Sequence, residues 1–154
     1  MARINKQYAG VIVRALAVAI DAMMLMPASV LISKLIGDNL MFAALANLIV
    51  GATYYVVFLS GHWQATPGKR IAGIYVMNED GSPLNQQQAL QRYLAYILPS
   101  LPVYSSLETS TSAMIMVWMS VAWFLPVLLM DNKTAIHDLL CNTRVVHGKA
   151  EEKR

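Results

Sequence analysis

Residues 14–33 read RALAVAIDAMMLMPASVLIS, and this stretch decides the fold. It is almost entirely apolar and has the ~20 residues that a helix needs to cross the hydrocarbon core of a bilayer. Arg14 stands at its entrance, and Asp21 interrupts it. A charge inside lipid costs several kcal/mol, with ~2.5–3.5 kcal/mol the low value for Asp or Arg at a helix centre. Both side chains are therefore expected to face the protein interior and to have partners there.

The composition supports a membrane protein. Hydrophobic residues make up 56% of the 154 residues and charged residues 14%, against ~45–50% and ~25% in soluble domains. The length favours a single domain, which we place at residues 1–148, followed by a charged tail at 149–154. Cys141 is the only cysteine, which excludes an intramolecular disulfide.

Four apolar runs predict four membrane helices, at about residues 10–34, 40–60, 89–107 and 113–130. The third is the weakest because it is short and contains Pro99 and Pro102. Lys and Arg concentrate in the N-terminal residues, in the segment 61–92 and in the tail, so the positive-inside rule places all three in the cytoplasm. That topology requires the third run to cross. The predicted fold is an all-α membrane protein, a four-transmembrane-helix bundle with a small cytoplasmic β element.

The central cytoplasmic segment predicts that β element. Thr66-Pro67-Gly68-Lys69 favours a type II turn, with Pro and Gly at its two central positions. Residues of about 70–77 and 143–147 have β-strand composition, and residues 82–91 suggest an amphipathic helical lead-in. Because isolated strands are marginal, we expect the two to pair beneath the bundle.

Several motifs, in this order and spacing, resemble the RDD family, small membrane proteins named for one arginine and two aspartates. The resemblance spans nearly the whole chain. Cys141-Asn142 departs from the small pair often found there. The matching elements are Arg14 and Asp21, then Thr66-Pro67-Gly68-Lys69-Arg70 with Gly73 and Val76, then Asp80-Gly81 and Arg92, and finally His137 to Leu140 and Thr143 to Val146.

The resemblance implies a multi-pass protein of the bacterial cytoplasmic (inner) membrane with both termini in the cytoplasm. It also allows cation–proton exchange, to which some members of the family have been linked. It implies that the cytoplasmic motif residues have a structural role: Thr66, Pro67, Gly68, Lys69, Arg70, Gly73, Arg92 and His137.

Arg14 and Asp21 are seven residues apart, so they share a helix face at a spacing of roughly 10 Å. They are too far apart for contact, and each needs another partner. Asp138 is the natural partner for Arg14 near the cytoplasmic boundary, with Arg92 as the substitute for Arg14. Two interpretations remain open: a proton or cation path in which Asp21 titrates, and a structural network that joins helices.

Depth matching places Asp21 level with Thr53 and Tyr54 and with no basic residue, which predicts an unpaired carboxylate. Proline also frees the carbonyl four residues before it, and this adds possible oxygen ligands for a hard cation. The alternative is that prolines are simply common in membrane helices. The freed carbonyls are those of Met23, Ala95 and Ala122, before Pro27, Pro99 and Pro126.

No motif points to catalysis, a metal centre, a cofactor or nucleic acid. Gly68-Lys69 lacks the spacing and the Ser or Thr of a phosphate-binding loop, and the three histidines are scattered. We therefore expect a protein that is not an enzyme, whose partner is the lipid bilayer. Two function classes remain. One is a small transporter, expected to be a homo-oligomer, and the other is an accessory subunit that binds a larger membrane protein or lipid.

Overall fold

Three long apolar helices dominate the computed structural model, which describes residues 7–37, 39–100, 109–131 and 133–148. They are α1 (Val11–Ile36), α2 (Leu40–Ser60) and α5 (Thr109–Leu129). Gly37 ends α1 at a φ of +66°, and the Asn39 side chain caps α2 by accepting from the Phe42 N–H. All three are long and apolar enough to cross a membrane, which confirms three of the four expected spans.

A fourth membrane span is not shown among the described residues. α4 comprises Gln86–Ile97 and is followed by a 3₁₀ turn, residues 98–100. Its twelve residues rise ~18 Å, short of the ~30 Å hydrocarbon core. It also begins earlier than expected, because Asn85 and Gln88 form a capping box. The part of the prediction that covers residues 101–107 lies outside the described residues, as does the tail at 149–154.

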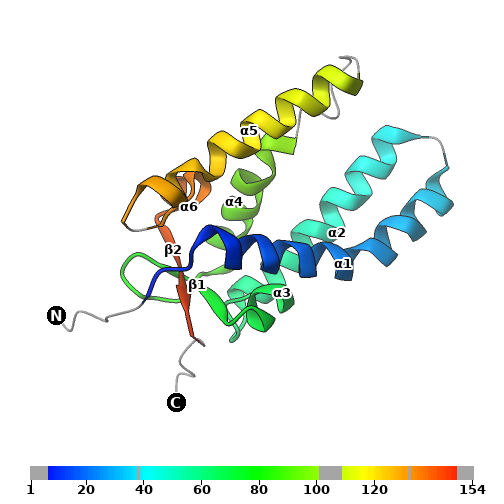
Figure 1. The fold of residues 1–154 in the computed structure, drawn as a ribbon. Helices are drawn as coiled ribbons and strands as arrows, with labels where there is room; N and C mark the ends of the chain where they lie inside the picture. Colours follow the sequence, from blue (N-terminus) through cyan, green and yellow to red (C-terminus); the bar gives the residue numbers. More distant parts are fainter. Residues whose placement is uncertain (1–6, 38, 101–108, 132, 149–154) are drawn as a thin grey trace.

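The remaining elements gather at one end of the long helices (Figure 1). They are α3 (Pro67–Ile71), β1 (Ile74–Asn78), α6 (Ile136–Leu140) and β2 (Thr143–His147). β1 and β2 pair antiparallel with Ile74 opposite His147, and Tyr8 forms a bridge with Val146 on the other side of β2. The expected pairing of the two β segments is confirmed, and it ties the start of α1 to the C-terminal strand.

The predicted type II turn at residues 66–69 is wrong, because these residues begin a helix. Thr66 is the N-cap of α3, and Pro67 occupies the first helical position, where its missing N–H costs nothing. Gly73, with a φ of +69°, then reverses the chain into β1. The first strand therefore starts at Ile74, because residues up to Ile71 belong to α3.

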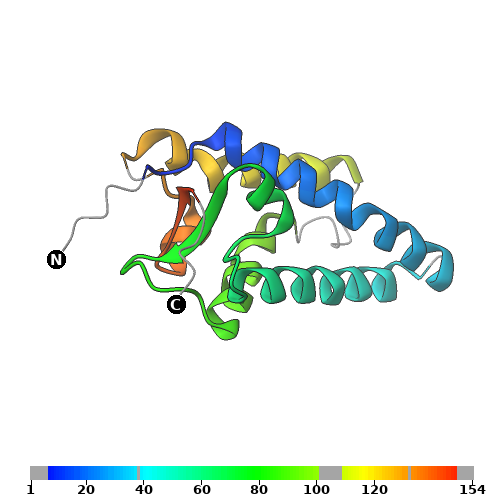
Figure 2. The ribbon, with the colours of Figure 1, turned by 90° about the horizontal axis from the view of Figure 1, so that it is seen from below.

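The packed core lies at the β end, and the long helices splay away from it. α1 and α2 form an antiparallel pair joined at one end (Figure 2), whereas α5 runs in another direction (Figure 1). Only 11% of the most apolar window of α1 and of α5 is buried within the molecule. Such apolar surface is stable where lipid or another membrane helix covers it.

Candidate functional site

Asp21 lies in α1 and is almost completely buried, with 1% of its surface exposed. Its Oδ1 accepts hydrogen bonds from the Tyr54 hydroxyl and the Gly68 backbone N–H, both at 2.7 Å. Its Oδ2 accepts from the Thr66 hydroxyl at 2.5 Å. Among the residues that the structure describes, no salt bridge reaches Asp21. As expected, no basic partner of Asp21 is found among these residues, and three uncharged donors surround its carboxylate.

The close approach of α3 to α1 makes this arrangement possible. A Cβ atom on Gly68 would lie 2.3 Å from the Ala17 carbonyl oxygen and 2.7 Å from the Asp21 carboxylate. Only a residue without a side chain fits there. The Thr-Pro-Gly segment, interpreted from sequence as a cytoplasmic turn, thus caps an aspartate in the first membrane helix.

A cavity of about 250 Å³ adjoins Asp21 between α1, α2 and α4. Apolar side chains form much of its wall. The polar side chains that line it are Asp21, Ser29, Asn47, Tyr55, Tyr93 and Tyr96.

Two polar contacts join α1 to α2 along this cavity. One is the Tyr54–Asp21 hydrogen bond, and in the other the Ser29 hydroxyl lies 2.6 Å from Asn47 Oδ1. Asp21 and Ser29 are eight residues apart, ~12 Å along the helix. Polar groups therefore extend along the α1–α2 seam rather than standing at a single point.

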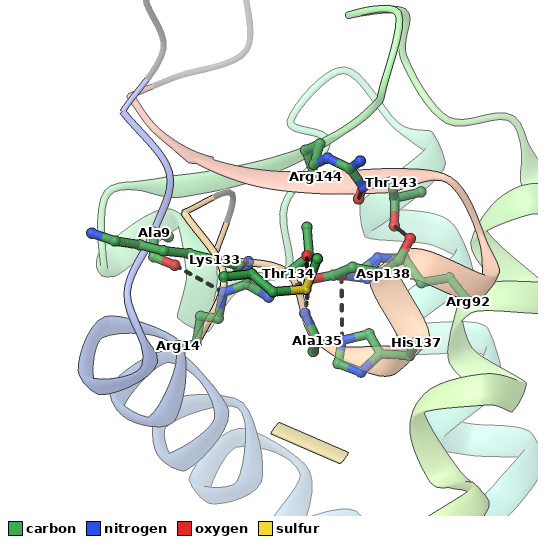
Figure 3. Close-up of polar contacts among 11 residues, drawn as sticks. Ala9, Arg14, Arg92, Lys133, Thr134, Ala135, His137, Asp138, Thr143 and Arg144 are labelled. Atoms are coloured by element: carbon green, nitrogen blue, oxygen red, sulfur yellow. Dashed lines mark hydrogen bonds and ion pairs between the residues drawn. The ribbon is translucent and has the colours of Figure 1, made fainter. Parts of the chain in front are cut away.

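Asp138, in α6, is the centre of a second buried cluster (Figure 3). Its Oδ2 accepts a charge-assisted hydrogen bond from Arg14 of α1, and its Oδ1 accepts one from Arg92 of α4. The Ala135 backbone N–H donates to Oδ2 at 3.2 Å. The expected Arg14–Asp138 contact is present, and Arg92, proposed only as a substitute, is present as well.

Arg14 is held by further hydrogen bonds. Its Nε donates to the Ala9 carbonyl at 3.1 Å, and a terminal nitrogen donates to the Lys133 carbonyl at 2.6 Å. Arg14 thereby joins Ala9, the segment before α6 and α6 itself. These contacts hold the start of α1 against α6.

The charges in this cluster shift two pKa values. Burial alone raises the pKa of Asp138, but Arg92, His137 and Arg14 outweigh it and hold that pKa well below its usual range. Burial, with further contributions from Arg92, Lys69 and Arg14, lowers the pKa of His137 to about 3 against the opposing charge of Asp138. The imidazole is neutral at pH 7, and its ring packs edge-on to Tyr96 and Phe124.

Lys69 interacts electrostatically with both aspartates. It follows Gly68 in α3, and its Nζ lies 5.4 Å from the centre of the Tyr55 ring. Burial, with smaller contributions from Arg92 and Arg14, lowers its pKa to about 7 against the opposing charges of Asp21 and Asp138. Both aspartates therefore act electrostatically on the same amine.

Some residues singled out from the sequence lie outside both clusters. Thr53 is exposed, and its hydroxyl bonds to the Ile49 carbonyl of its own helix. Arg70 is exposed, with its guanidinium 3.9 Å from the centre of the Trp63 ring. Of the two hydroxyls that depth matching places level with Asp21, Tyr54 contacts its carboxylate and Thr53 does not, because adjacent helical positions point in different directions.

The three backbone carbonyls that the hard-cation hypothesis required do not belong to residues that line the cavity. Met23, Ala95 and Ala122 are absent from the residues that line the cavity, and Met23 is 60% exposed on α1. Sequence reasoning missed the three cavity tyrosines. Their signal was the spacing of Tyr93 and Tyr96, three apart on one face of an amphipathic helix.

The family of this chain follows from comparison with known proteins. The RDD family model matches residues 8–142, which include both aspartate clusters. A Bacillus subtilis (strain 168) protein described as "Uncharacterized protein YxaI" is 29% identical over 103 residues, 67% of this chain. The match covers 56% of that relative's length. No solved structure matches the chain. The chain belongs to the RDD family of small membrane proteins.

Proposed function

We propose that this multi-pass protein passes protons or monovalent cations along the α1–α2 seam, with Asp21 as the group that carries the negative charge. The observation that supports the proposal is that a buried carboxylate, without a basic partner among the described residues, borders a cavity of about 250 Å³. Ionisable groups buried in membrane helices often mark ion and proton pathways.

The surroundings of Asp21 suit this role. A carboxylate offers about four lone-pair sites, and three hydrogen bonds occupy three of them. The cavity and the Ser29–Asn47 contact extend from Asp21 in one direction along the seam. Thr66 and Gly68 of the α3 segment cover it from another side. In this proposal, withdrawal of α3 opens Asp21 to the cytoplasm.

The proposed orientation has both termini and the segment 61–92 in the cytoplasm of a bacterial cell. The positive-inside distribution supports it. Cysteine labelling in intact cells tests it: Asp80→Cys should react only from the inside and Ser110→Cys only from the outside. Labelling of position 80 from outside would overturn the orientation.

Flux measurements on Asp21→Asn test the function. Asparagine keeps an oxygen for the Gly68 N–H and the Tyr54 hydroxyl but removes the titratable charge. In vesicles with an imposed pH gradient, the wild type should exchange protons for Na⁺, K⁺ or Li⁺, and Asp21→Asn should not. Asp80→Asn, in an exposed turn, is the matched control and should keep full flux. A wild type without flux, or an active Asp21→Asn, would overturn the proposal.

The alternative is an accessory subunit that does not transport. The observation that favours it is the exposed apolar surface of α5, which includes Trp118 at 68% and Leu128 at 66%. Such a surface could pack on a larger membrane protein or on a second copy of this chain. The mass of the protein purified in mild detergent separates these cases. A stable complex with a larger protein, together with absent flux, would favour the accessory role.

A further inference from the structure

We propose that the cavity between α1, α2 and α4 binds an organic ammonium ion, with Asp21 as its counter-ion and Tyr55, Tyr93 and Tyr96 as an aromatic wall. As a statement about the transported substrate, this inference rests on the proposed function. As a statement about binding, it can be tested independently of transport.

The dimensions and charge of the cavity suit a small organic cation. Its volume of about 250 Å³ equals the share of roughly eight water molecules in the liquid, at ~30 Å³ each. A ligand of about eight to ten non-hydrogen atoms fits that space. Asp21 is the only acidic residue in the lining, and no basic residue lines it among the described part of the chain. The wall therefore favours a single positive charge.

The three tyrosines form one contiguous aromatic cluster. The Tyr55 ring centre lies 5.2 Å from that of Tyr93 and 5.7 Å from that of Tyr96. Aromatic rings attract ammonium groups within ~6 Å of the ring centre. The Nζ atom of Lys69 already lies 5.4 Å from the centre of the Tyr55 ring, within this range. Lys69 itself is not part of the cavity wall.

A dehydrated divalent metal ion suits this cavity less well. A dehydrated hard cation such as Ca²⁺ or Mg²⁺ takes about six or more oxygen ligands. Here three donors occupy the Asp21 oxygens, and the Ser29 hydroxyl lies at 2.6 Å from Asn47 Oδ1. The Tyr93 hydroxyl donates to the Leu48 carbonyl at 3.2 Å. An ammonium with apolar substituents needs only one carboxylate and apolar or aromatic contacts, all of which the lining supplies.

Close helix packing maintains the aromatic wall. A Cβ atom on Gly51 would lie 2.3 Å from the Tyr93 hydroxyl oxygen, so glycine at this position lets the α4 tyrosine reach α2. Gly51 itself lines the cavity.

Binding of benzylammonium to the full-length protein in detergent tests the inference. Benzyl alcohol is the matched control, since it has the same number of non-hydrogen atoms and no charge. Benzylammonium should raise the melting temperature in a saturable manner and bind at least tenfold more tightly than benzyl alcohol. Asp21→Asn should weaken benzylammonium binding tenfold or more. Equal binding of the two probes would overturn the inference.

Filling the cavity provides a test that leaves Asp21 in place. Leu25→Phe, in the lining, should abolish benzylammonium binding, whereas Leu35→Phe, 76% exposed and outside the lining, should preserve it. Binding that survives Leu25→Phe would place the ligand elsewhere and overturn the inference.

The two proposals fail separately. Benzylammonium binding without any flux would contradict the proposed transport but support this site. Asp21-dependent flux of metal ions and protons, without benzylammonium binding, would support transport and overturn the organic ligand.

Discussion

The two buried aspartates are stabilised in different ways. Asp138 lies between two arginines, and charge-assisted hydrogen bonds hold it to α1 and α4. Asp21 has equally little exposed surface but is held by two hydroxyls and one backbone N–H, all uncharged donors. A charge paired with charge is costly to alter, whereas a charge held by neutral dipoles can change its occupancy or protonation with less disruption. The Asp138 cluster therefore suits a structural role, and Asp21 is the candidate for function.

Removal of the Asp138 charge should have the largest effect on stability. Asp138→Asn leaves Arg14 and Arg92 buried without a counter-charge, which should cost about 3–5 kcal/mol of unfolding free energy. Thermal or denaturant unfolding in one detergent measures the loss. Asp131→Asn, at an exposed aspartate, is the control and should change little. A loss of unfolding free energy in Asp138→Asn no larger than that in Asp21→Asn would contradict the difference between the two aspartates.

A methyl group on Gly68 should have the next largest effect. Gly68→Ala pushes a Cβ atom against the Ala17 carbonyl and the Asp21 carboxylate, so α3 must move away from α1. We expect a loss of about 1–3 kcal/mol, typical of overpacking. Gly10→Ala is the matched control, because no atom lies within 4 Å of a Cβ built there. Equal melting temperatures for the two variants would contradict the tight α1–α3 contact.

Loss of a single neutral donor to Asp21 should have a smaller effect. Thr66→Val keeps the shape of the side chain and removes the hydroxyl that donates to Oδ2, at a cost of about 1–2 kcal/mol. Tyr54→Phe should cost less, since Tyr54 is only partly buried. The two losses should not add if both act through Asp21, and a double-mutant cycle measures the coupling. Strict additivity would show that the donors act independently.

The pH dependence of Lys69 should be the smallest effect. Because folding lowers its pKa from 10.5 to about 7, the folded state favours the neutral amine. Its contribution to stability is fully present above pH 10.5 and is lost as the pH falls towards 7. One proton changes stability by at most ~1.4 kcal/mol per pH unit, and partial exposure reduces this. Stability should therefore rise from pH 7 to 9 in the wild type more than in Lys69→Met. Parallel curves would exclude Lys69 as the link between the clusters.

Local sequence determined the membrane helices and several contacts. Runs of apolar residues specify α1, α2 and α5, because hydropathy depends only on neighbouring residues. The β segments followed from composition, and their pairing followed from the instability of isolated strands. The Arg14–Asp138 contact could be predicted because two opposite charges at the same membrane boundary have few other partners.

Only the tertiary structure decided how Asp21 is stabilised. Thr66 and Gly68 are more than forty residues from Asp21 along the chain, and no local pattern reports that α3 packs against α1. The same holds for Arg92 at Asp138 and for the tyrosine wall, which require α4 to lie against α2 and α6. Hydropathy and turn propensity are summed over a few neighbouring residues, whereas these sites form where helices distant in sequence meet. The sequence thus shows which charged residues lie in apolar segments, and the packing of the helices determines their partners.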